Sequence, residues 1–372
     1  MKKRIVISGV NMVEGGILTI LKDVMDNFDT REDFDVICLV HKKELFRSDL
    51  KNIKILEFPD IKESWLKRLW FEYVTSYFLS KKIKADAWIC LHDVTANVIS
   101  EKKYVYCHNP TPFYKSSLKD FKLDKKFYIF TKLYKFLYMI NIKRNTRVIV
   151  QQNWIAHKFN DWYKLDNLLV AKPEARGIIN SELKKINKIQ GKIKLLYPAV
   201  PRVFKNFDLI VKSLSILREK KTDLFDKIEV ELTFFKGMNK VGDEVIRVCE
   251  ENNLKNINFI GFLNKEELAE KYRQENCILL FPSKLETWGL PLSEAKEYSL
   301  PILVSDLQYA YETINKYPYV CYFNPDDEES FIESLERILN GQFDGNREVN
   351  EDFMVINNWE EFVNLVNEDI ES

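Results

Sequence analysis

Two glutamates, Glu286 and Glu294, lie in a segment whose pattern predicts a strand, a loop, a helix and another strand, Phe281–Asp306. The helix is expected to begin near Leu290. In an open parallel sheet, ligands bind beyond the carboxyl ends of the strands, where this loop lies. The free N–H groups and the dipole of the helix N-terminus favour a phosphate. Each carboxylate can accept hydrogen bonds from vicinal hydroxyls, such as those of a sugar or a ribose.

Two cations, Arg202 and Lys205, stand between a predicted strand and a predicted helix in the segment Tyr197–Asp208. Cations near a helix N-terminus suit a diphosphate, and an arginine can bind two of its oxygens at once. Two ordinary surface charges are the alternative interpretation. The segment is therefore a candidate diphosphate site.

The N-terminal part of the chain contributes glycines and a histidine at the ends of predicted strands. Gly15 and Gly16 open a helix after a strand, so the backbone can approach an anionic ligand there. The spacing from Gly9 does not make the GxGxxG fingerprint of a dinucleotide site, which argues against an NAD-dependent oxidoreductase. His108 ends the strand Lys103–His108, where a histidine serves either a ligand or the structure.

The segment with the two glutamates resembles the large retaining glycosyltransferase family 4, whose members have the GT-B fold. The resemblance rests on the spacing Glu286-x7-Glu294, on the string ETWGLPLSEA and on the LPILVSD that follows it. A surface loop with two solvated glutamates would not explain the whole string. The resemblance implies that Glu286 contacts the donor hexose and that Glu294 binds the ribose of the nucleotide. The residues between them are expected to contact the sugar and the phosphate: Thr287, Trp288, Gly289 and Leu290.

The resemblance extends to two other turns of the C-terminal half. It assigns Arg202 and Lys205 to the donor diphosphate, although the commoner family form has a Gly-Arg pair and a wider spacing than PRVFKN. It places Phe262 and Leu263, which follow the strand INFIGF, beside the nucleotide base. With Glu286 and His108, the two cations form the expected catalytic set.

In the N-terminal half, the resemblance assigns acceptor-side roles. The loop with Gly15 and Gly16 is similar to a GG loop that closes over the donor phosphate and the acceptor. His108 lies in YCHNP, which resembles a YxHNP segment whose histidine faces the sugar in the cleft.

Two α/β domains are expected from the alternation of short apolar runs with helical patterns over 372 residues. The polar stretch 171–191 separates a Rossmann-like domain over residues 1–175 from a second over residues 192–352. A last amphipathic helix within residues 355–372 is predicted to pack back onto the first domain. The fold class is therefore α/β, with two Rossmann-like domains facing each other across a cleft, as in GT-B.

Cysteine usage and the N-terminus favour a cytoplasmic protein. None of the six cysteines forms a CxxC pair, and most lie in apolar runs, as reduced buried thiols do. MKKRIVISG lacks the apolar core of a signal peptide, and no run of about 18 apolar residues predicts a spanning helix. The DxD string Asp33–Asp35 lies far from the donor loop and is interpreted as turn chemistry. No metal, no cofactor besides the donor and no nucleic-acid partner are expected.

Two segments that combine basic and aromatic residues, 65–84 and 125–144, leave membrane contact open. They either lie at an anionic membrane surface or cover the N-terminal sheet with their apolar faces. The first half of the chain is basic, with 35 Lys+Arg and 22 Asp+Glu in residues 1–190, which suits an anionic surface or simply solvated helices. Peripheral contact at the inner face of the membrane is thus one of two hypotheses.

The predicted function is transfer of a hexose from a nucleotide-diphosphate sugar to a glycan or lipid-linked saccharide, with retention. Bacterial surface-polysaccharide synthesis, of a capsule or an O-antigen, is the pathway that the resemblance implies. Two alternatives stay open at this point. One is a sugar-nucleotide epimerase with the same fold, which needs no acceptor, and the other is a non-catalytic sugar-nucleotide-binding protein.

Overall fold

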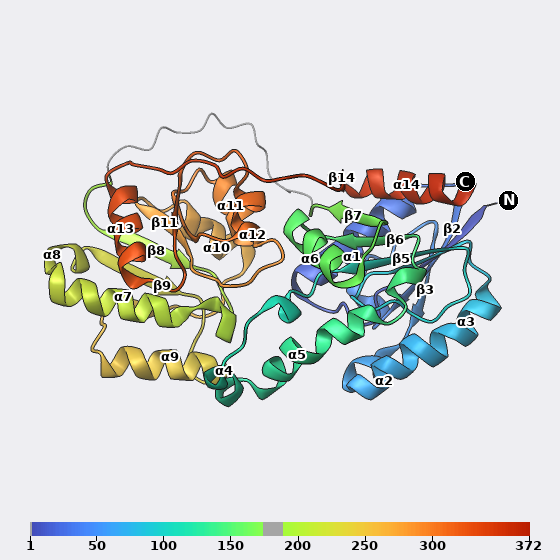
Figure 1. Cartoon of the computed structure of the whole chain (residues 1–372), viewed down its shortest axis with the longest axis horizontal. Helices are drawn as coiled ribbons and strands as arrows, with labels where there is room; N and C mark the ends of the chain where they lie inside the picture. Colours follow the sequence, from blue (N-terminus) through green and yellow to red (C-terminus); the bar gives the residue numbers. More distant parts are fainter. Residues whose placement is uncertain (1, 174–188) are drawn as a thin grey trace. The chain divides into compact units, whose positions relative to one another are not determined.

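A computed structural model describes residues 2–173 and 189–372 of the chain, which divide into two compact units. Unit 1 comprises residues 2–109, 133–173 and 350–372, and unit 2 comprises residues 110–132 and 189–349. Each unit has its own parallel sheet with helices around it (Figure 1). Among these residues, no helix combines the length and the apolar composition needed to span a bilayer.

The sheet of unit 1 has eight strands within the described ranges, in the order β14-β7-β6-β5-β4-β1-β2-β3. All neighbouring strands are parallel, because a helix or a long connection joins each strand to the next. Most of these strands are apolar on both faces, as in a sheet covered on both sides. The strands are β1 (Lys3–Ser8), β2 (Phe34–Val40), β3 (Ile53–Glu57), β4 (Ala87–Cys90), β5 (Lys102–Cys107), β6 (Arg147–Val150), β7 (Leu168–Ala171) and β14 (Met354–Ile356).

Helices cover the two faces of this sheet. One face carries the helix that follows β1 and the C-terminal helix, and the other carries those helices between β3 and β7 that belong to unit 1 (Figure 1). Tyr134 and Tyr138 are buried in that second layer, where they contact Trp65 and Phe159. The helices are α1 (Gly15–Asp29), α2 (Trp65–Trp70), α3 (Ser76–Ile83), α6 (Asn153–Tyr163) and α14 (Trp359–Glu371). Helix α5 (Lys125–Met139) spans the division between the units, and its residues from Leu133 onward belong to unit 1.

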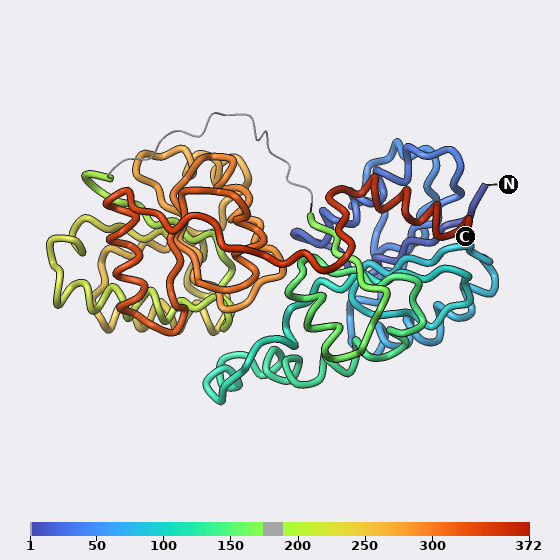
Figure 2. The backbone as a smooth tube through the Cα atoms, turned by 45° about the horizontal axis from the view of Figure 1, so that its top comes forward, coloured from blue at the N-terminus to red at the C-terminus, as the bar shows by residue number. Residues whose placement is uncertain are grey.

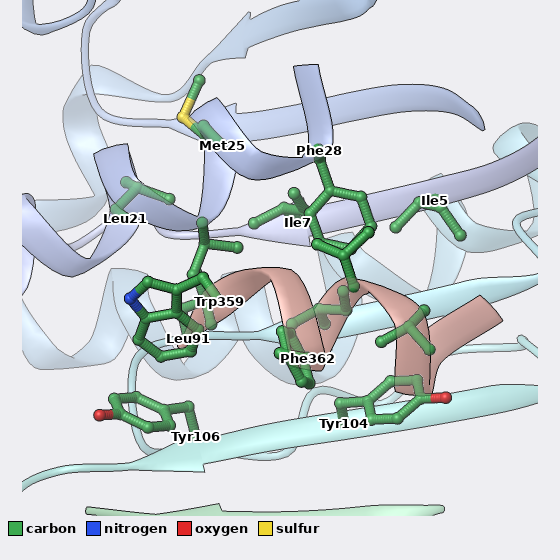
Figure 3. Close-up of a cluster of buried hydrophobic side chains, with 14 of the residues drawn as sticks. Ile5, Ile7, Leu21, Met25, Phe28, Leu91, Tyr104, Tyr106, Trp359 and Phe362 are labelled. Carbon is green, nitrogen blue, oxygen red and sulfur yellow. The ribbon is translucent and has the colours of Figure 1, made fainter. Parts of the chain in front are cut away.

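The C-terminal helix α14 packs on unit 1, although it follows the sequence of unit 2 (Figure 2). Its Trp359 and Phe362 are buried against Tyr104 and Tyr106 of β5 (Figure 3). At the polar end of the contact, Asp369 Oδ2 accepts a hydrogen bond from the Tyr104 hydroxyl at 3.1 Å. The short strand β14 precedes the helix and adds an edge to the unit 1 sheet.

Residues Trp65–Ile83 are helical throughout, but the helix is not regular along its length. A π-helical turn over Phe71–Thr75 separates α2 from α3. The apolar periodicity continues through this turn, so it does not reveal the extra residue that a π-turn inserts. The turn buries Glu72 completely, which a regular solvent-facing helix position would not do.

The sheet of unit 2 has six parallel strands in the residues that the structure places, in the order β10-β9-β8-β11-β12-β13. The strands are β8 (Ile193–Tyr197), β9 (Ile228–Leu232), β10 (Ile257–Phe259), β11 (Cys277–Phe281), β12 (Ile302–Ser305) and β13 (Val320–Phe323). The helices are α4 (Leu118–Leu123), α7 (Phe207–Lys220), α8 (Thr222–Phe225), α9 (Lys240–Glu251), α10 (Lys265–Tyr272), α11 (Leu290–Glu297), α12 (Gln308–Ile314) and α13 (Glu328–Leu339).

Residues 110–132 belong to unit 2, whereas the predicted N-terminal domain of residues 1–175 included them. Aromatic contacts explain the difference. The rings of Tyr114 and Phe127 lie 6.4 and 5.3 Å from the ring of Phe204, which follows β8. Such contacts between residues about 80 positions apart leave no local pattern in the sequence. Most of the predicted linker, residues 171–191, lies outside the described residues.

Candidate functional site

The strand order of unit 2 places the predicted donor residues at one crevice. From β8 the chain proceeds to β9 and β10 on one side, and from β11 to β12 and β13 on the other. The two loops after β8 and β11 therefore diverge, and such a switch point is where open α/β sheets bind ligands. Arg202 and Lys205 lie in the loop after β8, and Glu286 lies in the loop after β11.

Lys205 and Glu286 form an ion pair at this switch point, Nζ to Oε1. Both side chains are mostly buried, with 16% and 14% of their surface exposed. The ammonium group of Lys205 also lies 5.5 Å from the centre of the Phe281 ring, at the end of β11. A backbone hydrogen bond from Lys284 N–H to the Phe204 carbonyl, 2.8 Å, joins the two loops. The side chain predicted to bind the diphosphate, Lys205, is thus in direct contact with the side chain predicted to bind the sugar, Glu286.

Arg202 is exposed and points to a different neighbourhood. It lines a cavity of about 550 Å³ in unit 2, together with the segment around Tyr114 and Lys119. Lys284 and Asp326 also line this cavity, whereas Glu286 does not. Arg202 is held on the same loop as Lys205, whose N–H donates to its carbonyl at 3.0 Å. The two cations therefore flank the crevice without forming one cluster.

The turn before α11 is built around Gly289, which has a φ of +81°. A Cβ atom at this position would lie 3.1 Å from Leu292 Cδ1 and 3.3 Å from Phe281. The backbone there is closely packed and left-handed, a conformation that glycine adopts without strain. On either side, the Trp288 indole donates to Ser293 Oγ at 2.9 Å and the Trp288 carbonyl accepts from Thr313. These contacts fix the loop that carries Thr287, Trp288, Gly289 and Leu290.

The N-terminus of α11 points its positive dipole end at the crevice side of the sheet. Its cap residue, Gly289, offers no side chain to the first-turn N–H groups. Pro291 in the first turn lacks an N–H group. This helix end, with Lys205 nearby, is suited to an anionic group such as a phosphate.

Glu294, on α11, is held by a partner that the sequence analysis missed. The hydroxyl of Tyr272, in the last turn of α10, donates to Glu294 Oε2 at 3.0 Å. Tyr272 is buried, and its ring lies 5.3 Å from the ring of Tyr298. Burial, and then the nearby Glu294 carboxylate, raise the pKa of the Tyr272 phenol, so the hydroxyl keeps its proton and remains a donor. Since 22 residues separate the pair, no helical or strand spacing signals it.

Phe262 and Leu263 follow β10, beyond the carboxyl end of this edge strand. Gly261 has a φ of +79° and turns the chain there. Phe262 is 72% exposed, which is unusual for a large aromatic side chain of a folded unit. In the strand order, two strands lie between this turn and the loop of Glu286, namely β9 and β8.

Unit 1 has a corresponding switch point between β1 and β4, from which the strand order runs in both directions. Gly15 and Gly16 form the start of α1 in the loop after β1, and Gly15 has a φ of +63°. The N-cap residue Glu14 makes no side-chain capping bond. His108 follows β5, the neighbour of β4, and lies on the same edge of the sheet.

His108 is positioned by Asp93, a residue that the sequence analysis did not single out. The Asp93 Oδ1 atom accepts hydrogen bonds from the His108 and Asn109 N–H groups at 2.9 and 3.0 Å. It also lies 3.6 Å from His108 Nδ1. The hydroxyls of Tyr134 and Tyr138 donate to the same carboxylate at 3.0 and 3.1 Å. Asp93 lies three positions after the end of the buried strand β4, and an aspartate near the carboxyl end of an apolar run was the signal that the sequence offered.

Asp93 is ionised despite its burial. Desolvation acts to raise its pKa, but His108, Arg68 and the hydrogen bonds that it accepts together hold the pKa below the ordinary value. Its negative charge is therefore directed at the backbone and ring of His108.

Known proteins with similar sequences and structures identify the type of enzyme. Residues 179–353 match the family model described as Glycosyl transferases group 1. The structure of lipopolysaccharide outer core galactosyltransferase WaaB superposes with a TM-score of 0.67 at 15% identity, over 99% of each chain. The protein is a glycosyltransferase with the GT-B fold. Two α/β units with parallel sheets, as predicted, are thus confirmed as its architecture.

Two more relatives extend the likeness of this glycosyltransferase. A Klebsiella pneumoniae protein, "Uncharacterized 41.2 kDa protein in cps region", is 23% identical over 348 residues, covering 87% of each chain. Sucrose-phosphate synthase from Thermosynechococcus elongatus has a TM-score of 0.61 at 13% identity, covering 91% of this chain and 90% of its own. At such low identity the structural matches show the fold and leave the substrates open.

Next to the His108 loop, the glycosyltransferase buries a second polar cluster. Glu72 Oε1 lies 3.2 Å from His92 Nδ1, and both side chains are almost fully buried. His92 Nε2 lies 3.1 Å from the hydroxyl of Ser8, at the end of β1. The backbone carbonyl of His92 accepts a hydrogen bond from the Arg68 guanidinium at 2.6 Å. Burial raises the pKa of Glu72 to about 8 against the opposing effect of Arg68. Burial, together with Arg68, lowers the pKa of His92 to about 3. Near neutral pH, Glu72 and His92 are therefore both uncharged.

The DxD string of the glycosyltransferase pairs with arginines. Arg31 donates to both oxygens of Asp33 at 2.9 and 2.7 Å, and Arg4 donates to Asp35 at 2.8 Å. The hydrogen bond from Arg31 holds the pKa of Asp33 below its ordinary value. Across residues 2–173 and 189–372, no three His, Cys, Asp or Glu side chains gather closely enough to hold a metal ion.

Proposed function

We propose that the enzyme is a retaining glycosyltransferase of family 4 that transfers a hexose from a nucleotide-diphosphate sugar to a glycan or lipid-linked saccharide. The observation that carries this proposal is the ion pair of Lys205 with Glu286 at the switch point of unit 2. It places a cation for a diphosphate beside a carboxylate for a sugar, next to the N-terminus of α11. A nucleotide-sugar donor contains both a diphosphate and a sugar, so a single molecule can contact Lys205 and Glu286 at once.

In this proposal each part of the donor has its own ligands in unit 2. Lys205 and Arg202 bind the diphosphate, helped by the N-terminus of α11. Glu286 accepts hydrogen bonds from the hexose hydroxyls, and Glu294 accepts them from the ribose. The backbone of Thr287–Leu290 contacts the sugar and the phosphate. Phe262 and Leu263 lie beside the base, for which the exposed Phe262 ring offers a stacking surface.

The reaction proceeds by front-face attack, with the acceptor hydroxyl approaching on the side from which the diphosphate departs. The C–O bond to the diphosphate breaks, the acceptor oxygen bonds to the same carbon, and the leaving phosphate takes the acceptor proton. Lys205 and Arg202 stabilise the charge that grows on the leaving group in the transition state. These cations and the helix end supply positive charge without a metal. Unit 1 contributes Gly15, Gly16 and His108 on the acceptor side.

The biological setting proposed is assembly of a bacterial surface polysaccharide at the inner face of the cell membrane. The relative encoded in a cps region and the fold shared with a lipopolysaccharide galactosyltransferase support this setting. The enzyme is then cytoplasmic, with peripheral membrane contact and no nucleic-acid partner.

A thermal-shift panel tests donor binding. UDP, GDP, ADP and their common sugar conjugates are each added to the enzyme, and one nucleotide class is expected to raise the melting temperature selectively. An incubation of the selected sugar nucleotide without acceptor should return it unchanged. If that incubation yields an epimerised sugar, the enzyme is an epimerase.

The double variant Arg202→Ala/Lys205→Ala tests the chemical step, and transfer is expected to be abolished. Lys220→Ala/Lys221→Ala is the matched control, because both of these lysines are exposed on the same unit and pair with surface glutamates. Near-normal turnover of the Arg202/Lys205 variant would show that the mechanism is wrong.

A further inference from the structure

A stripe of exposed apolar side chains runs along the outer side of α5. Each member has between 39% and 58% of its surface exposed: Ile129, Leu133, Phe136 and Met139 on the helix, and Ile140 directly after its end. The inner side of the same helix is already satisfied, because Tyr134 and Tyr138 are buried against the sheet layer. A helix that is apolar on both sides has its second side available for a partner other than its own unit.

The charges around this stripe are all of one sign. Residues 125–144 contain six Lys or Arg and no Asp or Glu. Lys125 and Lys126 stand before the stripe, Lys143 and Arg144 stand after it, and Lys132 lies beside its centre, all of them exposed. The surface is therefore an apolar strip with cations at both ends and along one side.

Helices α2 and α3 extend the same surface. Leu66 and Trp70, one helical turn apart on α2, are 80% and 65% exposed, and Phe78 on α3 is also 65% exposed. Residues 65–84 contain five Lys or Arg, of which Arg68 is buried and the other four are exposed, and the one acidic residue among them, Glu72, is fully buried. The nearby Glu63 precedes α2 and pairs with Lys67.

Within unit 1, the part of the α5 stripe from Leu133 onward and the exposed side chains of α2 point to the same side. Helices α2 and α5 lie in one layer on one face of the sheet, and Trp65 of α2 contacts Tyr134 of α5, with 6.1 Å between ring centres (Figure 1). Side chains on the outer side of that layer point away from the sheet. Leu66 and Trp70 therefore extend from the same layer as the apolar strip of α5.

We propose that α2, α3 and α5 form a docking surface for an anionic lipid bilayer. Apolar side chains enter the boundary between headgroups and acyl chains, while the surrounding cations bind anionic headgroups. A second copy of the chain is a poor occupant, because it would bring two clusters of like charge together. This docking surface rests on the proposed function in one respect: a lipid-linked acceptor is located in a bilayer, so the enzyme would have to reach one.

Vesicle co-sedimentation tests the docking surface. The full-length enzyme is mixed with vesicles of phosphatidylcholine alone or with 30 mol% phosphatidylglycerol, at low and at physiological salt. We expect binding to the anionic vesicles, weakened at the higher salt concentration, and at least tenfold weaker binding to neutral vesicles. Equal binding to both kinds of vesicle, or binding to neither, would overturn the proposal.

Two sets of variants locate the surface. Leu133→Ser/Phe136→Ser removes apolar contacts, and Lys132→Gln/Lys143→Gln/Arg144→Gln removes charge. Each is expected to lower the partition coefficient at least tenfold. Met354→Ser is the control, because Met354 is half-exposed on the edge strand β14 of the same unit, outside the surface. If both sets bind vesicles as the wild type does, the surface is not the docking site.

Two readouts separate this inference from the proposed function. The nucleotide thermal shift and transfer to a water-soluble acceptor depend on the catalytic site, so both should be unchanged in the Leu133/Phe136 variant. A wild type that fails to bind vesicles but shows both activities would overturn the docking surface alone. Light scattering completes the test, since a dimer that the Leu133/Phe136 variant dissociates would identify a second copy as the occupant instead.

Discussion

Replacing Glu72 with glutamine is expected to raise the stability of unit 1 at neutral and alkaline pH. Glu72 is fully buried in the π-turn, and within the described residues neither of its carboxylate oxygens accepts a hydrogen bond. Its pKa is raised to about 8, so folding holds a proton that the unfolded chain has lost. Glutamine keeps the size of the side chain, offers an N–H donor in place of the carboxyl O–H next to His92, and cannot ionise.

The size of the effect follows from the two pKa values of the carboxyl group. The pKa of Glu72 is about 8 in the folded state and about 4.5 in the unfolded chain. Below about pH 4.5 both states hold the proton, and the free energy of unfolding is at its highest. As the pH rises toward 8, the unfolded chain loses the proton first, so the free energy of unfolding falls. Each pH unit in this window costs about 1.4 kcal/mol, which gives about 4 kcal/mol by pH 7.5. Local relaxation and water entry reduce the cost of burying a charge, so we expect Glu72→Gln to gain about 2–4 kcal/mol at pH 7.5 and little at pH 5.

Urea unfolding followed by tryptophan fluorescence between pH 5 and 8.5 measures this difference. Six of the seven tryptophans belong to unit 1, with Trp288 as the exception, so the signal reports mainly on the unit that contains Glu72. Glu63→Gln is the control, since Glu63 is exposed just before α2 and should leave the pH dependence unchanged. A gap between wild type and Glu72→Gln that does not widen with pH would refute the protonated state of Glu72.

Three further substitutions test the donor site and the returning helix. Tyr272→Phe removes the hydroxyl that orients Glu294 and should weaken nucleotide binding about tenfold by calorimetry, the equivalent of one hydrogen bond to a charged group. Gly289→Ala places a Cβ atom 3.1 Å from Leu292 at a positive φ, and should lower the stability of unit 2 by about 1–3 kcal/mol and reduce the thermal shift given by the selected sugar nucleotide. Trp359→Ala opens a cavity under α14 and should cost unit 1 about 3–5 kcal/mol in urea unfolding.

Each of these three has an outcome that contradicts it. Unchanged affinity in Tyr272→Phe would mean that the hydroxyl does not hold Glu294 for the ribose. A Gly289→Ala variant as stable as the wild type would show that the turn tolerates a Cβ atom. If Trp359→Ala costs less than the exposed Trp70→Ala, α14 contributes little to unit 1.

Most elements of the fold follow from local patterns, and the failures have identifiable causes. The apolar runs that became β1, β5 and β11 are typical of strands buried on both faces, so their positions could be predicted. β14 was missed because three residues carry no measurable period. The π-turn at Phe71–Thr75 was missed because an inserted residue leaves the surrounding helical pattern intact.

The candidate site divides in the same way. Glu286 and Glu294 share one strand-loop-helix segment, so their spacing and neighbours could be evaluated in the sequence alone. Tyr272 could not be assigned to Glu294, because the pair depends on how α10 packs beside α11. Asp93 could not be assigned to His108, because their proximity depends on β4 and β5 being neighbours in the sheet.

Local patterns are enough to predict the α/β alternation, the glutamate segment and the cations at strand ends, because side-chain period and helix-end chemistry act over a few residues. The ion pair of Lys205 with Glu286, 81 positions apart, and the return of Trp359 to the core of unit 1 follow from the folded chain alone. Such contacts depend on strand order, which the chain reaches when burial of apolar surface offsets the entropy of closing long loops.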